Sequence, residues 1–481
     1  MSHMTPITST ATRVVTLAAF LIFGFLCLLA QRHGIRLSFD SYYYVEYAKE
    51  FRHHLPESFG RAWPFGWPLL GAVAGVLGLS AYHGLLAWAV ASVAGIFLLG
   101  RHLLPWDRLG LVGGGLVLAA LGTFALTTVV AGVLSETSFA FVLLAFAHSL
   151  SRWPEPRAIV GSAGLALVAF CLRYAGGLAF VLLLVWGLFQ LGRLRAAGRL
   201  PLALLSGAAA GAIAAGLLVW NWSATGAFSG HARTAPAPSE WLGIFADFGW
   251  SLPGLLGGLG LSRALGFASA ARLPVGLILT AGVIALGWRG WRLAADPRIR
   301  ALGFLVAGYA VGLIVLRCLD RFDDLYNARM FVPLLMPWFL LVAWLAPAPR
   351  VFLAVCSCLL ALNAGLCGRG ASRQIGADVR PAVPIVAAAR PDEIIAINDA
   401  AFTLCAHVPQ AVVRTPGSRD PRWRKVRFVV IAAVPLDRAA QHSAFQPEWI
   451  ELASTLLAAG RFQERLRTPQ LIVLEQVHLS P

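Results

Sequence analysis

The sequence has little charge, and acidic residues are especially scarce. Its 481 residues include 23 Asp and Glu against 39 Lys and Arg, and charged residues make up 13% of the chain, about half the share found in soluble domains. Hydrophobic residues make up 58%, and the mean hydropathy is +0.71. A soluble protein of this length does not have such a composition, so we expect a polytopic α-helical membrane protein embedded in a lipid bilayer.

Motifs of several common protein classes are also missing. The seven cysteines are scattered, with neither metal-ligand spacing nor the pattern of a secreted disulfide framework. The net charge of +16 would suit a nucleic-acid partner, but the arginines gather in short links between apolar segments, where the positive-inside rule puts them in cytoplasmic loops. We therefore interpret the charge as topology and expect no nucleic acid to bind.

Apolar segments follow one another as far as about residue 371 and predict about eleven transmembrane helices. The expected crossings are residues 14–30, 82–99, 109–129, 133–150, 159–172, 176–191, 201–220, 274–291, 301–316, 330–345 and 351–366. Two further apolar stretches, 67–79 and 241–261, are expected to lie in the membrane interface. The first is too short to cross a bilayer, and the second is rich in Gly and interrupted by Pro253.

From about Ser372 the composition becomes that of a soluble domain. Strands are expected at 393–398, 427–432 and 471–475, with a helix at 447–459. The sequence thus predicts a transmembrane domain over 1–371 and a small α/β domain over 372–481. With the amino terminus inside, the arginine-rich links are cytoplasmic, and Asp40, Glu136 and the C-terminal domain share the extracytoplasmic side.

A polar and aromatic segment that contains Asp40 separates the first two apolar segments. Asp40 follows the first apolar segment by a few residues, so its carboxylate is expected at the membrane surface, where an acidic side chain is often functional. We therefore interpret Asp40 as a candidate catalytic base. The alternative is that Asp40 caps a helix over 41–51, in which Tyr44, Tyr47 and Phe51 recur at helical spacing. Both interpretations can hold together.

Four features of the sequence occur in an order that resembles a known family. They are Phe39-Asp40 before a Tyr-rich helix, the segment Trp63-Pro64-Phe65-Gly66-Trp67-Pro68-Leu69-Leu70, an acidic residue at Glu136, and the segment Arg329-Met-Phe-Val-Pro333-Leu-Leu-Met-Pro337. Together they resemble the lipid-dependent membrane glycosyltransferases of the GT-C fold, in the bacterial branch of protein mannosyltransferases and the aminoarabinose transferase that acts on lipid A. The sequence departs from the family by Glu at 136, where Asp is commoner, and by Phe65, where a second Pro is usual.

The chemistry of sugar transfer suggests a role for each candidate residue. A transfer from a polyprenyl-phosphate sugar needs a base for the acceptor's proton, cations for the leaving phosphate and aromatic surfaces for the sugar and lipid. Asp40 is the expected base and Glu136 a second catalytic acid. The expected phosphate-binding residues are Arg329, Arg61 and Arg173, since guanidinium makes planar, bidentate contacts to phosphate. The expected substrate-binding aromatic residues are Tyr44, Trp63 and Tyr326.

The resemblance implies an integral glycosyltransferase, moving a hexosyl or pentosyl group, in the bacterial plasma membrane. Its polyprenyl-phosphate donor would give up the sugar by inverting displacement to an envelope protein, glycolipid or polysaccharide on the outer face. No obligatory metal is expected, although a divalent ion shared by Asp40 and Glu136 remains an alternative. A second alternative is a transporter or flippase of a lipid-linked sugar. The absence of repeats and of charge at the centres of the spans disfavours it.

Overall fold

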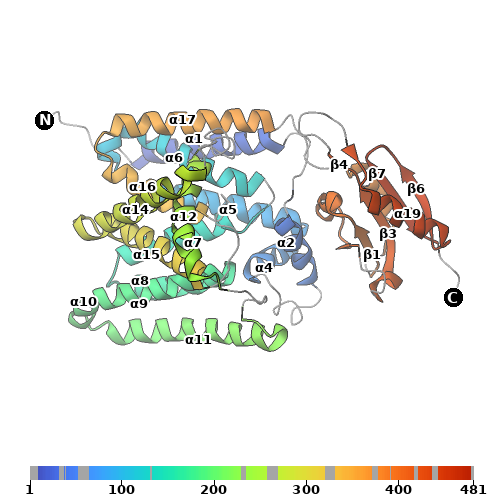
Figure 1. Cartoon of the computed structure of the whole chain (residues 1–481). Helices are drawn as coiled ribbons and strands as arrows, with labels where there is room; N and C mark the ends of the chain where they lie inside the picture. The colour runs from blue at the N-terminus through green and yellow to red at the C-terminus, as the bar shows by residue number, and fades with distance from the viewer. Residues whose placement is uncertain are drawn as a thin grey trace.

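The computed structural model describes residues 9–31, 37, 39–52, 64–130, 133–228, 235–256, 269–319, 331–370, 378–390, 392–415, 421–435 and 443–477. Long helices run side by side in a bundle, and a small sheet domain lies beyond one end of it (Figure 1). α1 begins at the opposite end of the bundle, far from the sheet domain. The fold class expected from the sequence, a helical membrane domain followed by a small α/β domain, is therefore confirmed.

Each expected crossing overlaps one main helix of the bundle. The ranges 133–150 and 176–191 extend a few residues beyond their helices, and residue 330 of the range 330–345 lies outside the described residues. Among the described residues, the helices long and apolar enough to span a membrane are α1 (Ser9–Gln31), α5 (Ala81–Leu103), α6 (Trp106–Val130), α11 (Leu200–Thr225), α14 (Ser269–Leu293), α15 (Pro297–Leu319) and α17 (Pro349–Gly370). Shorter apolar helices occupy the other expected crossings: α7 (Glu136–Ser151), α8 (Pro156–Leu172), α9 (Gly177–Phe189) and α16 (Val332–Leu345). α10 (Leu191–Ala196) links α9 to α11.

The helices differ in how much of their apolar surface other helices cover. The most apolar window of α6 is 72% buried within the protein and that of α15 is 67% buried, whereas the corresponding window of α11 is only 11% buried. Exposed apolar side chains such as Leu204, Leu205 and Ile213 cover α11. Such a surface suits contact with lipid chains, so α6 and α15 form the interior of the bundle and α11 its periphery.

Both stretches expected in the membrane interface form helices. The first is the short pair α4 (Gly66–Val73) and η1 (Ala74–Leu77), which is too short to cross. In the second, α12 (Trp241–Leu256) follows η3 (Pro238–Glu240) and packs closely along α14, and residues 257–261 lie outside the described residues. A Cβ atom at Gly249 would lie 2.0 Å from the carbonyl oxygen of Gly276, so only glycine permits this approach of the two backbones.

The sheet domain has the strand order β2-β1-β3-β7-β6, in which β1 is parallel to β2 and β3, and β7 is antiparallel to β3 and β6. Its main elements are β1 (Ile394–Ile397), β2 (Ala411–Arg414), β3 (Val426–Ala432), α19 (Pro447–Ala458), β6 (Phe462–Arg467) and β7 (Leu471–Gln476). Short elements complete it: η5 (Arg380–Ala382), α18 (Val383–Val386), η6 (Asp399–Ala406), η7 (Pro421–Lys425), β4 (Val434–Pro435) and β5 (Ser443–Ala444).

The sequence predicted the strands β1, β3 and β7 and the helix α19, but not the edge strands β2 and β6. The central strands β3 and β7 are buried over almost their whole length, and each contains an apolar run, over residues 428–432 and 471–474 respectively. β6 has the sequence Phe-Gln-Glu-Arg-Leu-Arg and exposes most of its side chains. Charged side chains on an edge strand prevent pairing with other chains, and they also hide the strand from an analysis of apolar pattern.

Candidate active site

Asp40 lies in the first turn of α2 (Phe39–Glu50), at the end of the bundle that faces the sheet domain (Figure 1). The alternative interpretation made Asp40 the N-cap of a helix over 41–51. The helix instead begins at Phe39, one residue before Asp40, so Asp40 lies inside its first turn. A carboxylate in the first turn still interacts favourably with the helix dipole. Asp40 is partly exposed.

One turn further along α2, Tyr44 is buried and contacts the segment that precedes α7. Its hydroxyl lies 3.4 Å from the hydroxyl of Ser135, and either group can donate the hydrogen bond. Burial is the largest cause that raises the pKa of Tyr44 to about 12, and the charges of Glu136 and Asp40 act in the same direction. Tyr44 therefore stays a neutral hydroxyl at physiological pH.

Glu136 is the first residue of α7 and forms an ion pair with Arg173. Arg173 Nη1 donates hydrogen bonds to Glu136 Oε1 at 2.6 Å and to Ser135 Oγ at 3.3 Å. The side chain of Glu136 is 2% exposed and that of Arg173 is 14% exposed, so water screens this pair only weakly. Four side chains from three separate segments, namely Tyr44, Ser135, Glu136 and Arg173, thus form one connected polar cluster.

Arg173 lies at a break between two helices. It has an extended backbone between α8 and η2 (Tyr174–Gly176), and α9 then continues the chain. The backbone at Gly176 lies close to the last turn of α8: a Cβ atom at Gly176 would lie 2.2 Å from the carbonyl group of Ala169. Glycine is the residue that this turn permits. The break between the two helices presents the guanidinium group of Arg173 to Glu136.

Two neighbouring residues of the Trp-Pro segment support the backbone on both sides of this ion pair. The indole N–H of Trp67, which is fully buried, donates a hydrogen bond of 2.7 Å to the carbonyl oxygen of Val133. A Cβ atom at Gly66 would lie 2.6 Å from the carbonyl oxygen of Cys171. α4 is thereby packed against the residues that lead to Glu136 and against those that lead to Arg173.

The backbone of Val133 is strained. Its φ angle is +56°, in the left-handed region that a β-branched residue rarely adopts. A conformation of this kind is unfavourable by about 1–3 kcal/mol and persists only where the surrounding contacts impose it, which happens most often at functional sites. The hydrogen bond from Trp67 is one such contact. Sequence reasoning included Trp67 in a family motif but did not identify its partner.

The opposite face of α2 packs against the sheet domain. Tyr42 Oη donates a hydrogen bond of 2.7 Å to the carbonyl oxygen of Val412 on β2, and its ring stacks on Phe402 with centroids 4.9 Å apart. Glu46 accepts a hydrogen bond of 2.9 Å from the backbone N–H of Val412, and Lys49 bridges Glu46 Oε1 and the carbonyl oxygen of Gln410. α2 thus covers the edge strand β2 and connects the polar cluster to the sheet domain.

Half of the residues predicted for the site belong to this arrangement. Tyr44, Glu136 and Arg173 are in contact through Ser135, and Asp40 lies one helical turn from Tyr44. The other candidates, Arg61, Trp63, Tyr326 and Arg329, lie outside the described residues and stay predictions. Sequence reasoning missed Ser135, Tyr42 and Glu46. The last two follow each other at helical spacing on α2, which was the available signal.

Within the described ranges, no group of three or more His, Cys, Asp or Glu side chains is arranged to hold a metal ion.

Comparisons with known proteins give a likeness in fold. No protein-family model matches the chain, and no curated protein matches it in sequence. The crystal structure of ArnT from Cupriavidus metallidurans bound to undecaprenyl phosphate superimposes with a TM-score of 0.52 at 16% identity, covering 98% of this chain and 99% of ArnT. The archaeal oligosaccharyltransferase AglB from Archaeoglobus fulgidus, in complex with an inhibitory peptide and a dolichol-phosphate, gives a TM-score of 0.47 at 14% identity over 88% of this chain and 69% of AglB. The near-complete superposition on ArnT shows that the chain has the GT-C fold that its sequence motifs indicated.

Proposed function

We propose that this protein transfers a sugar from a polyprenyl-phosphate donor to an acceptor of the cell envelope. In this reaction a hydroxyl group of the acceptor attacks the anomeric carbon, the bond from that carbon to the phosphate oxygen breaks, and the polyprenyl phosphate leaves with the bonding electrons. A base accepts the hydroxyl proton. A single displacement of this kind inverts the configuration at the anomeric carbon and forms no covalent intermediate with the enzyme.

The observation that carries this proposal is the buried polar cluster of Tyr44, Ser135, Glu136 and Arg173 beside Asp40, in a bundle of long apolar helices. An acidic residue beside a buried, hydrogen-bonded network in a membrane protein marks a functional site. The fold adds support, because ArnT was crystallised with undecaprenyl phosphate bound. A polyprenyl phosphate is therefore a donor carrier that this architecture is able to accommodate.

We assign the base to Asp40, which is partly exposed, and not to Glu136, whose carboxylate is buried and paired with Arg173. Glu136 and Arg173 then act by holding Ser135 and Tyr44 in place around the reacting sugar. In the proposed site Arg61 and Arg329 remain the residues for the leaving phosphate, with Arg173 as a third cation, and Trp63 and Tyr326 remain aromatic contacts of the substrate. Charge on the phosphate develops as the bond breaks, so these cations stabilise the transition state.

The proposed setting is the bacterial plasma membrane, with the site and the sheet domain on the extracytoplasmic side. The acceptor is an envelope protein, a glycolipid or a polysaccharide. The sheet domain, which contacts α2 through Tyr42 and Glu46, is the part of the chain that we expect to affect the choice of acceptor.

A transfer assay tests the proposal. Protein purified in detergent is given labelled polyprenyl-phosphate sugars together with envelope extract, and transfer of the label and hydrolysis of the donor are both measured. We expect labelled acceptor that depends on Asp40. If the protein neither transfers sugar nor hydrolyses the donor with any of a panel of donor sugars, the proposed enzymatic activity is refuted. Movement of intact donor across reconstituted vesicles would favour a transporter instead.

A further inference from the structure

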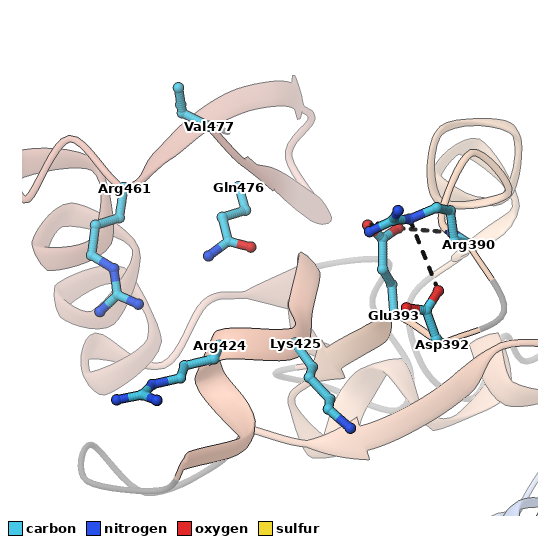
Figure 2. A pocket seen from close by; sticks show the side chains of 8 residues that line it. All are labelled: Arg390, Asp392, Glu393, Arg424, Lys425, Arg461, Gln476 and Val477. Atoms are coloured by element: carbon cyan, nitrogen blue, oxygen red, sulfur yellow. Dashed lines mark hydrogen bonds and ion pairs between the residues drawn. The ribbon is translucent and has the colours of Figure 1, made fainter. Parts of the chain in front are cut away.

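A second polar site lies in the sheet domain, away from the cluster around Tyr44. It is a pocket of about 410 Å³ between the start of β1, the 3-10 helix η7 and the ends of β6 and β7 (Figure 2). Its charged lining residues are Arg390, Asp392, Glu393, Arg424, Lys425 and Arg461. The volume is in the range of pockets that hold small molecules.

Positive charge predominates in this pocket. Its two acidic residues are both engaged by Arg390, whose Nε lies 3.2 Å from Glu393 Oε1 and 3.9 Å from Asp392 Oδ1. Across the parts of the chain that the structure covers, no carboxylate lies within ion-pair distance of Arg424, Lys425 or Arg461. Elsewhere in the same domain, arginines such as Arg427 and Arg467 do have carboxylate partners.

The arrangement of these side chains suits an anionic group. In Figure 2 the guanidinium groups of Arg424 and Arg461 lie on the same side of the hollow, and the Arg390 ion pairs lie on the other. Like charges that gather without a counter-charge repel each other, and an anion bound between them removes that repulsion. Guanidinium groups also bind phosphate and carboxylate oxygens in a planar, bidentate geometry.

The side chain of Gln476 lies between these two halves of the pocket. A side-chain amide both donates and accepts hydrogen bonds, as the hydroxyl groups of a sugar require. We propose that the pocket binds a saccharide that carries a phosphate or carboxylate group, with Arg424 and Arg461 on the anion and Gln476 on the sugar. The assignment of the pocket as a subsite for an anionic acceptor rests on the proposed function. The binding of an anionic sugar to the pocket does not depend on that function.

The pocket is connected to the helix that carries Asp40. Arg390, on its wall, follows Ala389, whose carbonyl oxygen accepts a hydrogen bond of 2.7 Å from the Gln410 side chain. The carbonyl oxygen of Gln410 in turn accepts a hydrogen bond of 3.0 Å from Lys49 on α2. An acceptor held in the pocket is therefore bound on a domain that is attached directly to α2, which suits a subsite that holds the remote part of a large acceptor.

Binding of glucose 6-phosphate to the full-length protein in detergent tests this site, measured by calorimetry beside glucose, glucuronate and inorganic phosphate. The test variant is the double substitution Arg424→Gln and Arg461→Gln. The matched control is Arg380→Gln with Arg467→Gln, which removes the same charge from two exposed arginines of the domain that pair with Asp378 and Glu464. The charged sugars should bind and glucose should not. The test variant should weaken glucose 6-phosphate binding by about tenfold or more, and the control should not.

Equal weakening in the test and control variants would overturn the proposal, because it would reveal a response to net charge alone. Absence of saturable binding to wild-type protein would do the same. Binding to phosphatidylglycerol nanodiscs that depends on Arg424 and Arg461, without binding of any sugar phosphate, would assign the pocket to phospholipid and overturn the saccharide site. Donor hydrolysis, measured in parallel, should be unchanged in the test variant. Sugar-phosphate binding by a protein that never transfers sugar would refute the proposed function and leave the anion site intact.

Discussion

The backbone N–H of Val412, on an edge strand of the sheet domain, donates a hydrogen bond of 2.9 Å to the carboxylate of Glu46 on α2. Glu46 lies on one face of that helix, and Asp40 and Tyr44 precede it by six and two residues. The edge strand β2 is thereby covered, which protects it from pairing with other chains. The same contact fixes the position of the helix that carries the proposed base.

The burial of the Glu46 carboxyl predicts a dependence of stability on pH. Burial, the largest effect, raises the pKa of the Glu46 carboxyl, although Lys49 and the hydrogen bond from Val412 oppose it. The folded protein therefore binds a proton here at a pH at which the unfolded chain has released it, so this contribution to stability is lost as the pH rises through the folded pKa. Glu46→Gln keeps an oxygen that accepts from Val412 and should flatten this part of the curve. Thermal melts over the acidic range measure it, and identical pH slopes in wild type and variant would contradict it.

Substitution of Asp40 tests the proposed base. Asp40→Asn keeps the size of the side chain but not its ability to accept a proton, so turnover should fall by roughly 10² to 10⁴. The loss of a charge from the first turn of α2 should reduce stability by only about 0.3–1 kcal/mol. Glu448→Gln is the control, because Glu448 lies in the first turn of α19, outside the proposed site. Near wild-type transfer by the Asp40→Asn variant would remove Asp40 from the mechanism.

The ion pair between Glu136 and Arg173 predicts strong coupling in a double-mutant cycle. Glu136→Gln and Arg173→Gln should each reduce the free energy of unfolding by about 3–5 kcal/mol, because each leaves a buried charge without its partner. The double variant should recover much of that loss. The exposed pair of Arg467 and Glu464 serves as control, with an expected coupling of about 0–1 kcal/mol.

Donor affinity in the same cycle separates the two roles of Arg173. If Arg173 binds the donor phosphate, the double variant regains stability while its affinity for the polyprenyl-phosphate sugar stays low. If Arg173 only positions Glu136, donor affinity recovers together with stability. Coupling no larger than that of the exposed control pair would show that the buried ion pair does not form in solution.

Gly66→Ala should disturb the site without touching its polar groups. The added methyl group would lie 2.6 Å from the carbonyl oxygen of Cys171, so α4 must move away from the segment that carries Arg173. We expect a loss of about 1–3 kcal/mol of stability and a lower turnover. Gly164→Ala is the matched control, since no atom lies within 4 Å of its added methyl group, and it should be neutral or stabilising by up to about 1 kcal/mol. Equal melting temperatures for the two variants would refute the close contact.

Labelling of single cysteines tests the proposed sidedness. In a variant without the natural cysteines, Glu464→Cys on the exposed strand β6 should react with an impermeant maleimide added to intact cells. Arg195→Cys, in the arginine-rich link between α9 and α11, should react only after the membrane is permeabilised. Labelling of both from outside, or of neither, would contradict the expected topology.

The sequence by itself determined the membrane class, the positions of the apolar helices and the existence of the sheet domain. Each depends on composition or on local pattern: a long apolar run has to leave water, and arginines mark the links between such runs. The central strands β3 and β7 were predictable for the same reason, because each contains an apolar run of four or five residues. The strands β2 and β6 were not: β6 is an edge strand rich in charged side chains, and β2, although mostly apolar, has only four residues.

Only the tertiary structure decided how the candidate residues meet. Asp40, Glu136 and Arg173 were each identified from the sequence, yet the pairing of Glu136 with Arg173 depends on how α4 packs against two other segments through Gly66 and Trp67. The contact of Glu46 with Val412 joins positions that are hundreds of residues apart. Such contacts follow from the packing of whole elements, and no local spacing in the chain encodes them, so the site's residues could be predicted individually while its geometry could not.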